Sequence, residues 1–156
     1  MVVVGAGTAV AQAEVEGTMG DDVLRGTMGH DSLDGLDGHD VISGLGATDT
    51  IWGGGGGDML RGNKKPDMIM GEGGSDIVLG GWGDDVLYGA YGPGGPLPNT
   101  PASPDLIRGQ GGDDFIDSAD APGAPDEVFC GDGYDEVYAD REDIVGSGCE
   151  VVRFAN

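Results

Sequence analysis

Between residues 17 and 88 the chain alternates glycine-rich loops with short apolar runs at a fixed interval of nine residues. Eight such nonapeptides follow one another without a gap, from GTMGDDVLR to GGWGDDVLY. The first position is glycine in all eight, the sixth is aspartate and the eighth is aliphatic. Side chains alternate along a strand, so the eighth residue points inward and its neighbours point outward. The pattern therefore predicts very short strands at 23–25, 32–34, 41–43, 50–52, 59–61, 68–70, 77–79 and 86–88.

A repeat of this length predicts an all-β fold, a parallel β-roll in which two nonapeptides make one coil of eighteen residues. Each coil then has a strand on each side, and the loops of alternate repeats stack along the same edge. We expect the glycines at positions one and four to adopt positive φ, which turns the loop sharply and presents carbonyl oxygens inward. The fourth position is glycine in six repeats, but Ala47 and Lys65 break it.

Charge adds a constraint that the hydrophobic pattern does not contain. The 156 residues hold 29 acidic and 7 basic residues, for a formal net charge of −22, together with 34 glycines. Such a chain repels nucleic acid and, without counter-ions, favours disorder. Stacked aspartates repel one another strongly unless cations lie between them. Carboxylate and carbonyl oxygens in the absence of sulfur suit calcium.

The consensus of the repeats is G-G-x-G-x-D-x-U-x, where U is aliphatic, and it resembles the RTX, or hemolysin-type, calcium-binding nonapeptide repeat family. The resemblance implies that one loop contributes the carbonyls of positions two and four and its aspartate. The next loop on the same edge contributes the carbonyls of positions one and three and its aspartate. The loop of Asp22 would thus meet the loop of Asp40. Eight repeats leave three gaps on each edge, or about six internal calcium ions.

Carried over residue by residue, the implied metal ligands extend through the regular repeats and into the degenerate copies behind them. They are Thr18, Gly20, Asp22, Thr27, Gly29, Asp31, Gly35, Asp37, Asp40, Gly44, Gly46, Asp49, Gly53, Gly55, Asp58, Asp67, Gly71, Gly73, Asp76, Gly80, Trp82, Asp85, Asp105, Gly109, Gly111, Asp114, Asp126 and Asp135. The copy GNKKPD at 62–67 is the least regular, so we expect any weak site there. Because one inward aliphatic per nine residues makes a thin core, calcium binding and folding should be one event.

The chain divides into five segments on these patterns. Residues 1–16 are a lead-in, 17–88 the regular repeats, 89–104 a Pro/Gly-rich inserted loop, 105–129 irregular repeats and 130–156 a C-terminal cap. The insertion adds eleven residues before Asp105 restores the frame, and three more precede Asp126.

The two ends bear on the compartment in which the protein works. Ala11 and Ala13 form an A-x-A pattern that resembles the end of a secretory signal peptide, with cleavage after Ala13; the alternative is a frayed N-terminal strand. Two cysteines, Cys130 and Cys149, suggest a disulfide in a secreted chain, and two free thiols are the alternative. A terminal cysteine pair is similar to that of secreted, extracellular members of the family from actinobacteria.

Catalytic motifs are absent from the sequence. His30 and His39 both occupy position five, but adjacent repeats place them on opposite edges, so we expect exposed loop residues. The outward positions of the even-numbered repeats are unusually apolar: Trp52, Met68, Met70, Val86 and Tyr88. Either the inserted loop or the cap covers this face, or it is a surface for a protein partner or self-association.

The sequence therefore predicts a secreted calcium-binding structural or binding module with no enzymatic activity. The alternative is a calcium-folded accessory region of a larger secreted enzyme, adhesin or toxin. No run of residues is long and apolar enough to predict a membrane span.

Overall fold

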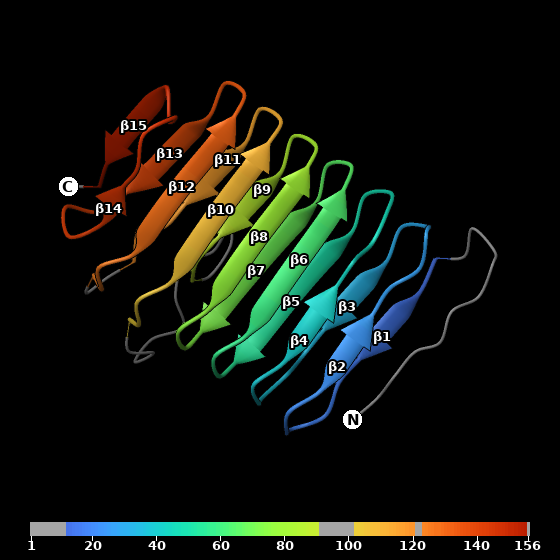
Figure 1. Cartoon of the computed structure of the whole chain (residues 1–156). Coiled ribbons are helices and arrows are strands. Elements are labelled where there is room, and N and C mark those ends of the chain that lie inside the picture. The colour runs from blue at the N-terminus through green and yellow to red at the C-terminus, as the bar shows by residue number, and fades with distance from the viewer. Residues whose placement is uncertain (1–11, 91–101, 121–122, 156) are drawn as a thin grey trace.

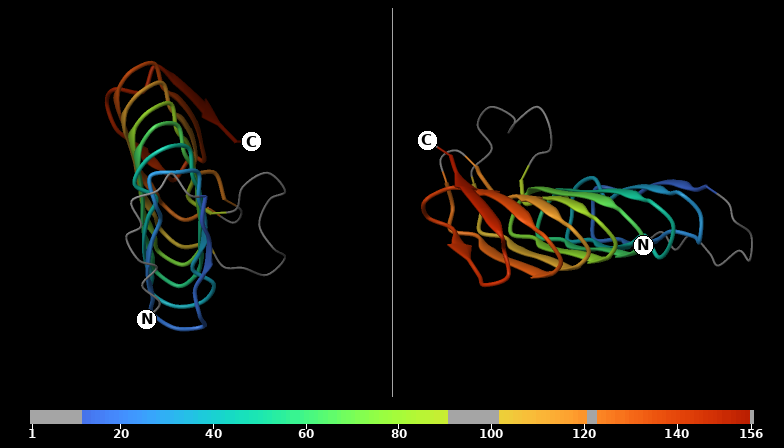
Figure 2. Two further views of the ribbon diagram at one scale, coloured as in Figure 1. Left: turned by 90° about the vertical axis from the view of Figure 1, so that its right-hand side faces the viewer. Right: turned by 90° about the horizontal axis from the view of Figure 1, so that it is seen from above.

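The computed structural model describes residues 12–90, 102–120 and 123–155, and all regular structure in these ranges is β-strand. The strands wind into a stack of flattened coils, a parallel β-solenoid of about 7 turns with β1 at one end and β15 at the other (Figure 1). Figure 2 shows the two sheets facing each other across the thin interior. This arrangement confirms the predicted all-β parallel roll. Within the described ranges, no helix long and apolar enough to cross a membrane is present.

Odd-numbered and even-numbered strands form two separate sheets, which we call the odd sheet and the even sheet. The odd sheet holds β1 (Glu14–Glu16), β3 (Ser32–Asp34), β5 (Thr50–Gly55), β7 (Met68–Gly73), β9 (Val86–Tyr88), β11 (Phe115–Asp117), β13 (Glu136–Ala139) and β15 (Val151–Phe154). The even sheet holds β2 (Val23–Arg25), β4 (Val41–Ser43), β6 (Met59–Lys64), β8 (Ile77–Trp82), β10 (Leu106–Gly111), β12 (Glu127–Asp132) and β14 (Ile144–Val145). Every pairing is parallel, with each strand beside the strand two further along the chain.

The core is a single column of aliphatic side chains from each sheet. Each regular strand contributes its position-eight residue, which is fully or almost fully buried while both neighbours are more exposed. The column consists of Val15, Leu24, Leu33, Ile42, Ile51, Leu60, Ile69, Val78, Leu87, Ile107, Ile116, Val128 and Val137, joined by Cys130 and Ala139 near the C-terminal end. One buried side chain per strand leaves little apolar area to stabilise so much ordered loop.

The strand register confirms that the nine-residue repeat resumes in frame after each of the two irregular connections. Ile77 pairs with Leu106, a separation of 29 residues in place of 18, because eleven residues are inserted between them. Leu106 pairs in turn with Glu127, where three extra residues are accommodated. Residues 91–101 of the inserted loop lie outside the described residues. The insertions therefore leave the ladder of the even sheet in register.

The C-terminal segment adds strands to both sheets and is fastened by a disulfide. β14 pairs with β12, and β15 pairs with β13. The predicted disulfide between Cys130 and Cys149 is present, with a Cα separation of 5.3 Å. It joins the buried part of β12 to the loop before β15. An ion pair between Arg153 and Glu136 also links β15 to β13.

The apolar outer face lies on the odd sheet and is less exposed than its sequence suggests. Met70 stands between Trp52 and Tyr88 in the register and is 7% exposed. Tyr88 makes an edge-to-face contact with Phe115 on the next strand, at 6.5 Å between ring centroids. The expected covering by the inserted loop falls on residues outside the described ranges, and the described cap strands extend the sheet edges.

Candidate metal centre

The strands from β2 to β13 are each preceded by an aspartate at position six that is buried under its loop. These twelve side chains are at most 6% exposed: Asp22, Asp31, Asp40, Asp49, Asp58, Asp67, Asp76, Asp85, Asp105, Asp114, Asp126 and Asp135. Burial of so many ionisable groups requires compensating partners, because an isolated buried carboxylate is very costly. The partners of the two carboxylate oxygens differ, and each oxygen is described in turn.

The Oδ1 atoms form a hydrogen-bonded ladder along each edge of the roll. On one edge the N–H of Asp22 donates to Asp40 Oδ1 at 2.7 Å, and the N–H of Asp40 donates to Asp58 Oδ1 at 2.8 Å. The same step of one coil repeats through Asp76, Asp105 and Asp126. The carboxylate of one coil therefore fixes the backbone of the coil before it.

The ladder continues into the cap, which the repeat pattern of the sequence did not reveal. Asp126 donates its N–H to Asp143 Oδ1 on one edge, and Asp135 donates to Glu150 Oε2 on the other. Each acceptor directly precedes a short apolar strand, β14 or β15. The sequences D-I-V at 143–145 and E-V-V at 150–152 resemble the end of a repeat, with an acid before two apolar residues, but the glycines of the consensus are missing there.

The Oδ2 atoms point into the loops and lack a hydrogen-bond partner. This holds within the described residues for Asp40, Asp49, Asp58, Asp67, Asp76, Asp85, Asp114 and Asp135, each with its Oδ2 buried. Asp22 Oδ2 and Asp31 Oδ2 differ: the first accepts from the backbone N–H and the hydroxyl of Thr18, and the second from the backbone N–H of Thr27. A regular series of orphaned, buried carboxylate oxygens is the mark of a group that a proton or a cation must satisfy.

A carbonyl oxygen of the next coil lies beside several of the Oδ2 atoms at position six. A Cβ placed on Gly53 would lie 2.6 Å from Asp58 Oδ2 and 2.7 Å from the carbonyl oxygen of Gly71 in the next coil. A Cβ on Gly26 would meet Asp31 Oδ2 at 2.5 Å and the carbonyl oxygen of Gly44 at 2.6 Å. Carboxylate and carbonyl oxygens thus converge from two coils at position one. Such a donor set of hard oxygens fits calcium.

The position-one glycines therefore have a different role from the one we expected. None of the eight adopts a positive φ, so this part of the expectation is wrong; glycine is required there because a side chain would fill the space between the oxygens. At position four, positive φ occurs as expected from Gly38 onward, but not at Gly20 or Gly29, where the expectation is wrong; it also occurs at position two. The non-glycine residues in that conformation are Leu36, Leu45, Ala47, Asn63, Lys65, Glu72 and Gln110.

The loops predicted to share an ion are stacked against each other. A Cβ on Gly38 would contact the backbone of Gly20 one coil earlier, and the N–H of Gly38 donates to the carbonyl of Gly55 one coil later, at 2.7 Å. Position-three carbonyls among the candidate ligands, including those of Gly73, Trp82 and Gly111, accept equivalent bonds. A carbonyl oxygen has a second lone pair, which leaves it able to contact a cation.

The geometry also excludes a site built from side chains alone. Within the part of the chain that the structure describes, no three His, Cys, Asp or Glu side chains gather as a metal-binding group. His30 and His39 lie on opposite edges, and their Nδ1 atoms hydrogen-bond to the carbonyls of Thr48 and Gly57. The irregular copy at 62–67 keeps its place in the ladder, since Asp49 donates its N–H to Asp67 Oδ1. Whether that copy binds a cation weakly stays a prediction.

Burial raises the pKa of aspartates in the ladder. Loss of hydration is the largest cause and raises the pKa of Asp67 to about 7 and that of Asp76 to about 8, while the backbone N–H bonds of the ladder act in the opposite direction. Repulsion by neighbouring acids adds to the rise, from Asp49 and Asp85 for the first and from Asp105 and Asp58 for the second. Without a cation, these carboxyl groups are held toward the protonated form.

We predict that Gly53→Ala weakens the metal centre whereas Gly20→Ala does not. The added methyl at Gly53 would collide with Asp58 Oδ2 and the Gly71 carbonyl, while a Cβ on Gly20 has nothing within 4 Å. Overpacking of this kind costs about 1–3 kcal/mol, so the calcium concentration at the folding midpoint should rise for Gly53→Ala only. Equal midpoints for the two variants in a calcium titration followed by circular dichroism would contradict this role.

We also predict that the metal-free chain loses stability as the pH rises from about 4 to about 8. The unfolded aspartates release protons near the ordinary pKa of 3.8, whereas the folded ones hold theirs until about 6 to 8. Rising pH therefore favours the unfolded state across this window. Far-UV circular dichroism of demetallated protein at about pH 5 and about pH 8 measures the difference as the fraction of β-structure that remains. Greater stability at the higher pH would show that the ladder is not protonated when metal-free.

The comparison with protein families gives one match. The model of the RTX calcium-binding nonapeptide repeat (4 copies) matches residues 16–51, 52–87 and 102–120, more than half of the chain. No curated protein and no solved structure was found to match. The matched ranges exclude Cys130 and Cys149, so the likeness to secreted actinobacterial members stays a prediction. With its stacked loops, its aspartate ladder and this match, the chain belongs to the RTX calcium-binding nonapeptide repeat family, and its repeats bind several calcium ions.

Proposed function

We propose that this protein is a secreted β-roll that calcium folds into a structural or binding module. The observation that carries the proposal is the series of eight buried position-six Asp Oδ2 atoms without partners among the described residues, which lie on both edges of the roll. A divalent cation between successive loops satisfies these oxygens and offsets the repulsion along the ladder.

The proposed ligands are the carboxylates of position six and the loop carbonyls of the coils on either side. The convergence of Asp58 Oδ2 and the Gly71 carbonyl oxygen on Gly53 supports this assignment. When bound, calcium supplies positive charge and oxygen coordination in place of hydration. The chain's own contribution is to hold each carboxylate in place through its Oδ1 bond to the preceding coil, as between Asp40 and Asp22.

Folding should depend on the cation because the rest of the roll cannot replace it. The core offers one aliphatic side chain per strand, and the loops contain positive-φ residues that cost backbone energy. Without calcium, the folded roll near neutral pH must either hold these aspartates protonated or leave them ionised and stacked one coil apart, and both cost free energy relative to the unfolded chain. The folded and calcium-bound states should therefore be one state.

Two observations bear on secretion. RTX repeat proteins are typically secreted, and a disulfide such as Cys130–Cys149 persists in oxidising, extracellular surroundings. Ala13, however, packs against the core, and its N–H donates to Asp31 Oδ1 at 2.7 Å. Cleavage after Ala13 would remove this first bond of the odd-sheet ladder, so we propose secretion without assigning the cleavage site.

A second candidate is an accessory role beside another folded domain. Its support is the C-terminal end of the roll, where Ile144 on β14 and Phe154 on β15 are both more than half exposed. These strands end the two sheets and could stack on a further domain of a secreted enzyme, adhesin or toxin. RTX rolls themselves are structural calcium-binding modules and not typically catalytic.

We predict that demetallated protein at neutral pH lacks most of its β-structure and regains it in about millimolar calcium. Far-UV circular dichroism recorded with a chelator and then with calcium measures this change, and magnesium at equal concentration serves as the control. Since magnesium demands a small, near-ideal octahedral site and dehydrates reluctantly, it should not restore the spectrum. A spectrum that is the same with chelator and with calcium would refute calcium-driven folding.

A further inference from the structure

The outer face of the even sheet carries a row of evenly spaced arginines. Arg25 on β2, Arg61 on β6 and Arg108 on β10 all occupy position nine, and the register places Ser43 and Leu79 between them. Neighbouring strands lie about 4.7–4.9 Å apart, so the Cα atoms of these arginines repeat about every 9.5 Å along the roll. Three of the chain's 7 basic residues are thus aligned on one face.

These arginines are not balanced by acids on the same face. Among the described residues, the only ion pair found is Arg153–Glu136, which belongs to the odd sheet. At positions seven and nine of the described even-sheet strands, Glu127 is the single acid. The corresponding odd-sheet positions hold five: Glu14, Glu16, Asp34, Asp117 and Glu136. In a chain with a net charge of −22, an unpaired row of cations is an anion-binding feature.

Apolar neighbours hold two of the guanidinium groups. Arg61 Nη2 lies 3.2 Å from Met59 Sδ, and the guanidinium of Arg108 lies 5.3 Å from the centre of the Phe129 ring. The stacking of Arg108 on Phe129 orients its guanidinium and leaves the edge available for a carboxylate, and the Arg61 bond to Met59 leaves its other N–H donors available.

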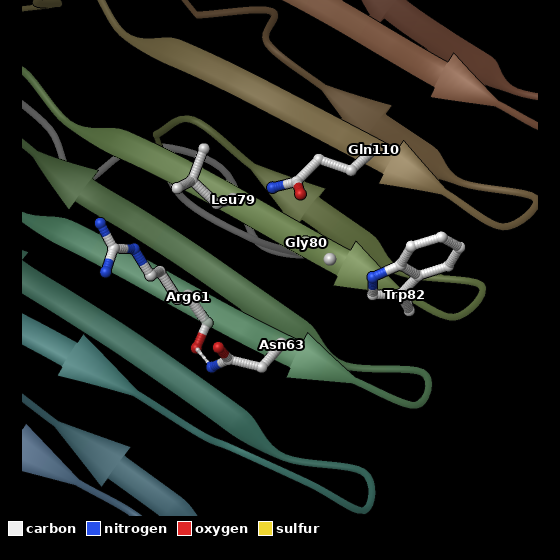
Figure 3. A pocket seen from close by; sticks show the side chains of 7 residues that line it. Arg61, Asn63, Leu79, Gly80, Trp82 and Gln110 are labelled. Atoms are coloured by element: carbon white, nitrogen blue, oxygen red, sulfur yellow. Dashed lines mark hydrogen bonds between the residues drawn. The ribbon is translucent and has the colours of Figure 1, made fainter.

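A hollow of about 250 Å³ opens beside the row (Figure 3). It is lined by Arg61, Asn63, Leu79, Gly81, Trp82 and Gln110. Asn63 and Gln110 flank Gly81, which has no side chain, in the register. The Asn63 Nδ2 donates to Ser43 Oγ and to the carbonyl of Arg61, which leaves its Oδ1 as an acceptor for a ligand hydroxyl. The Trp82 side chain at the rim is 73% exposed. Guanidinium, amides and indole together offer partners for a carboxylate, for hydroxyl groups and for the apolar face of a ring.

We propose that this face binds a linear glycan that carries a carboxylate on every second sugar. A sugar advances along such a chain by about the distance between neighbouring strands, so alternate sugars would meet alternate strands and hence the arginines. The indole of Trp82 stacks on a sugar ring, while Asn63 and Gln110 bond to hydroxyls. The glycan lies along the axis of the roll, across β2 to β10.

The spacing distinguishes this occupant from other polyanions. Side chains on one face of an extended acidic peptide repeat about every 6.6 Å, which does not match a row with a period near 9.5 Å. Nucleic acid carries a charge about every 3.4 Å per strand, and its higher charge density is repelled more strongly by an acidic protein. The acids of the odd sheet gather toward its two ends, so a second copy of the chain does not match the row either.

The inference goes beyond the proposed function but rests on it, because the even sheet must first be folded with calcium. A hyaluronan octasaccharide is a suitable probe, since it has a carboxylate on every second sugar. Isothermal titration with calcium-loaded protein should show binding that Arg61→Gln combined with Arg108→Gln weakens at least about tenfold. Trp82→Ala should weaken it several-fold. The control Arg153→Gln removes one positive charge on the odd sheet and should leave binding unchanged.

Circular dichroism of each variant in calcium separates a lost fold from a lost glycan site, so a failure of calcium-driven folding is recognised independently. A neutral cello-oligosaccharide should bind weakly, and poly-L-glutamate should not compete. The proposal is overturned if the folded wild type does not bind hyaluronan, or if Arg153→Gln weakens binding as much as the double variant. Equal binding of poly-L-glutamate would also overturn it, as would a dimer in sedimentation that the double variant dissociates.

Discussion

The roll depends on the aspartate at position six of each half-coil. One oxygen of its carboxylate accepts a backbone hydrogen bond, and the other faces the proposed cation. One oxygen of Asp58 accepts the N–H of Asp40 and holds two coils in register, while the other is buried without a hydrogen-bond partner. The first interaction sets the parallel stacking, and the second makes the stack unstable on its own. The same side chain thus specifies the fold and makes it conditional on calcium.

Other features of the repeat follow from that constraint. Glycine occupies position one because the space between Asp58 Oδ2 and the Gly71 carbonyl oxygen must stay free of a side chain. The strands are short because most of each nonapeptide forms the loop, and a single aliphatic residue faces the interior. Insertions are tolerated between β9 and β10 and between β11 and β12, since the next aspartate re-enters the ladder.

Much of this architecture could be predicted from the period of nine residues, including the strands, the inward residue and the frame after Asp105. The disulfide was predicted as one of two alternatives. The conformation of the loops could not be predicted, since Leu36 and Gln110 adopt a positive φ that their residue types do not favour. Nor did the pattern identify Asp143 and Glu150 as the last members of the ladder, because Glu150 is not aspartate and neither has the consensus glycines. The charge difference between the two sheets appears only when the register aligns position nine.

With calcium holding the edges, the two outer faces are free to differ. The odd sheet is apolar at its centre, where Met70 lies between Trp52 and Tyr88, and the even sheet carries the arginine row. Hydrogen exchange followed by mass spectrometry tests the central claim most directly, because it reports the strand bonds coil by coil. In calcium, amides from β3 to β8 should be protected; after chelation at neutral pH they should all exchange at the rate of an unfolded chain. Protection that survives chelation would contradict the account.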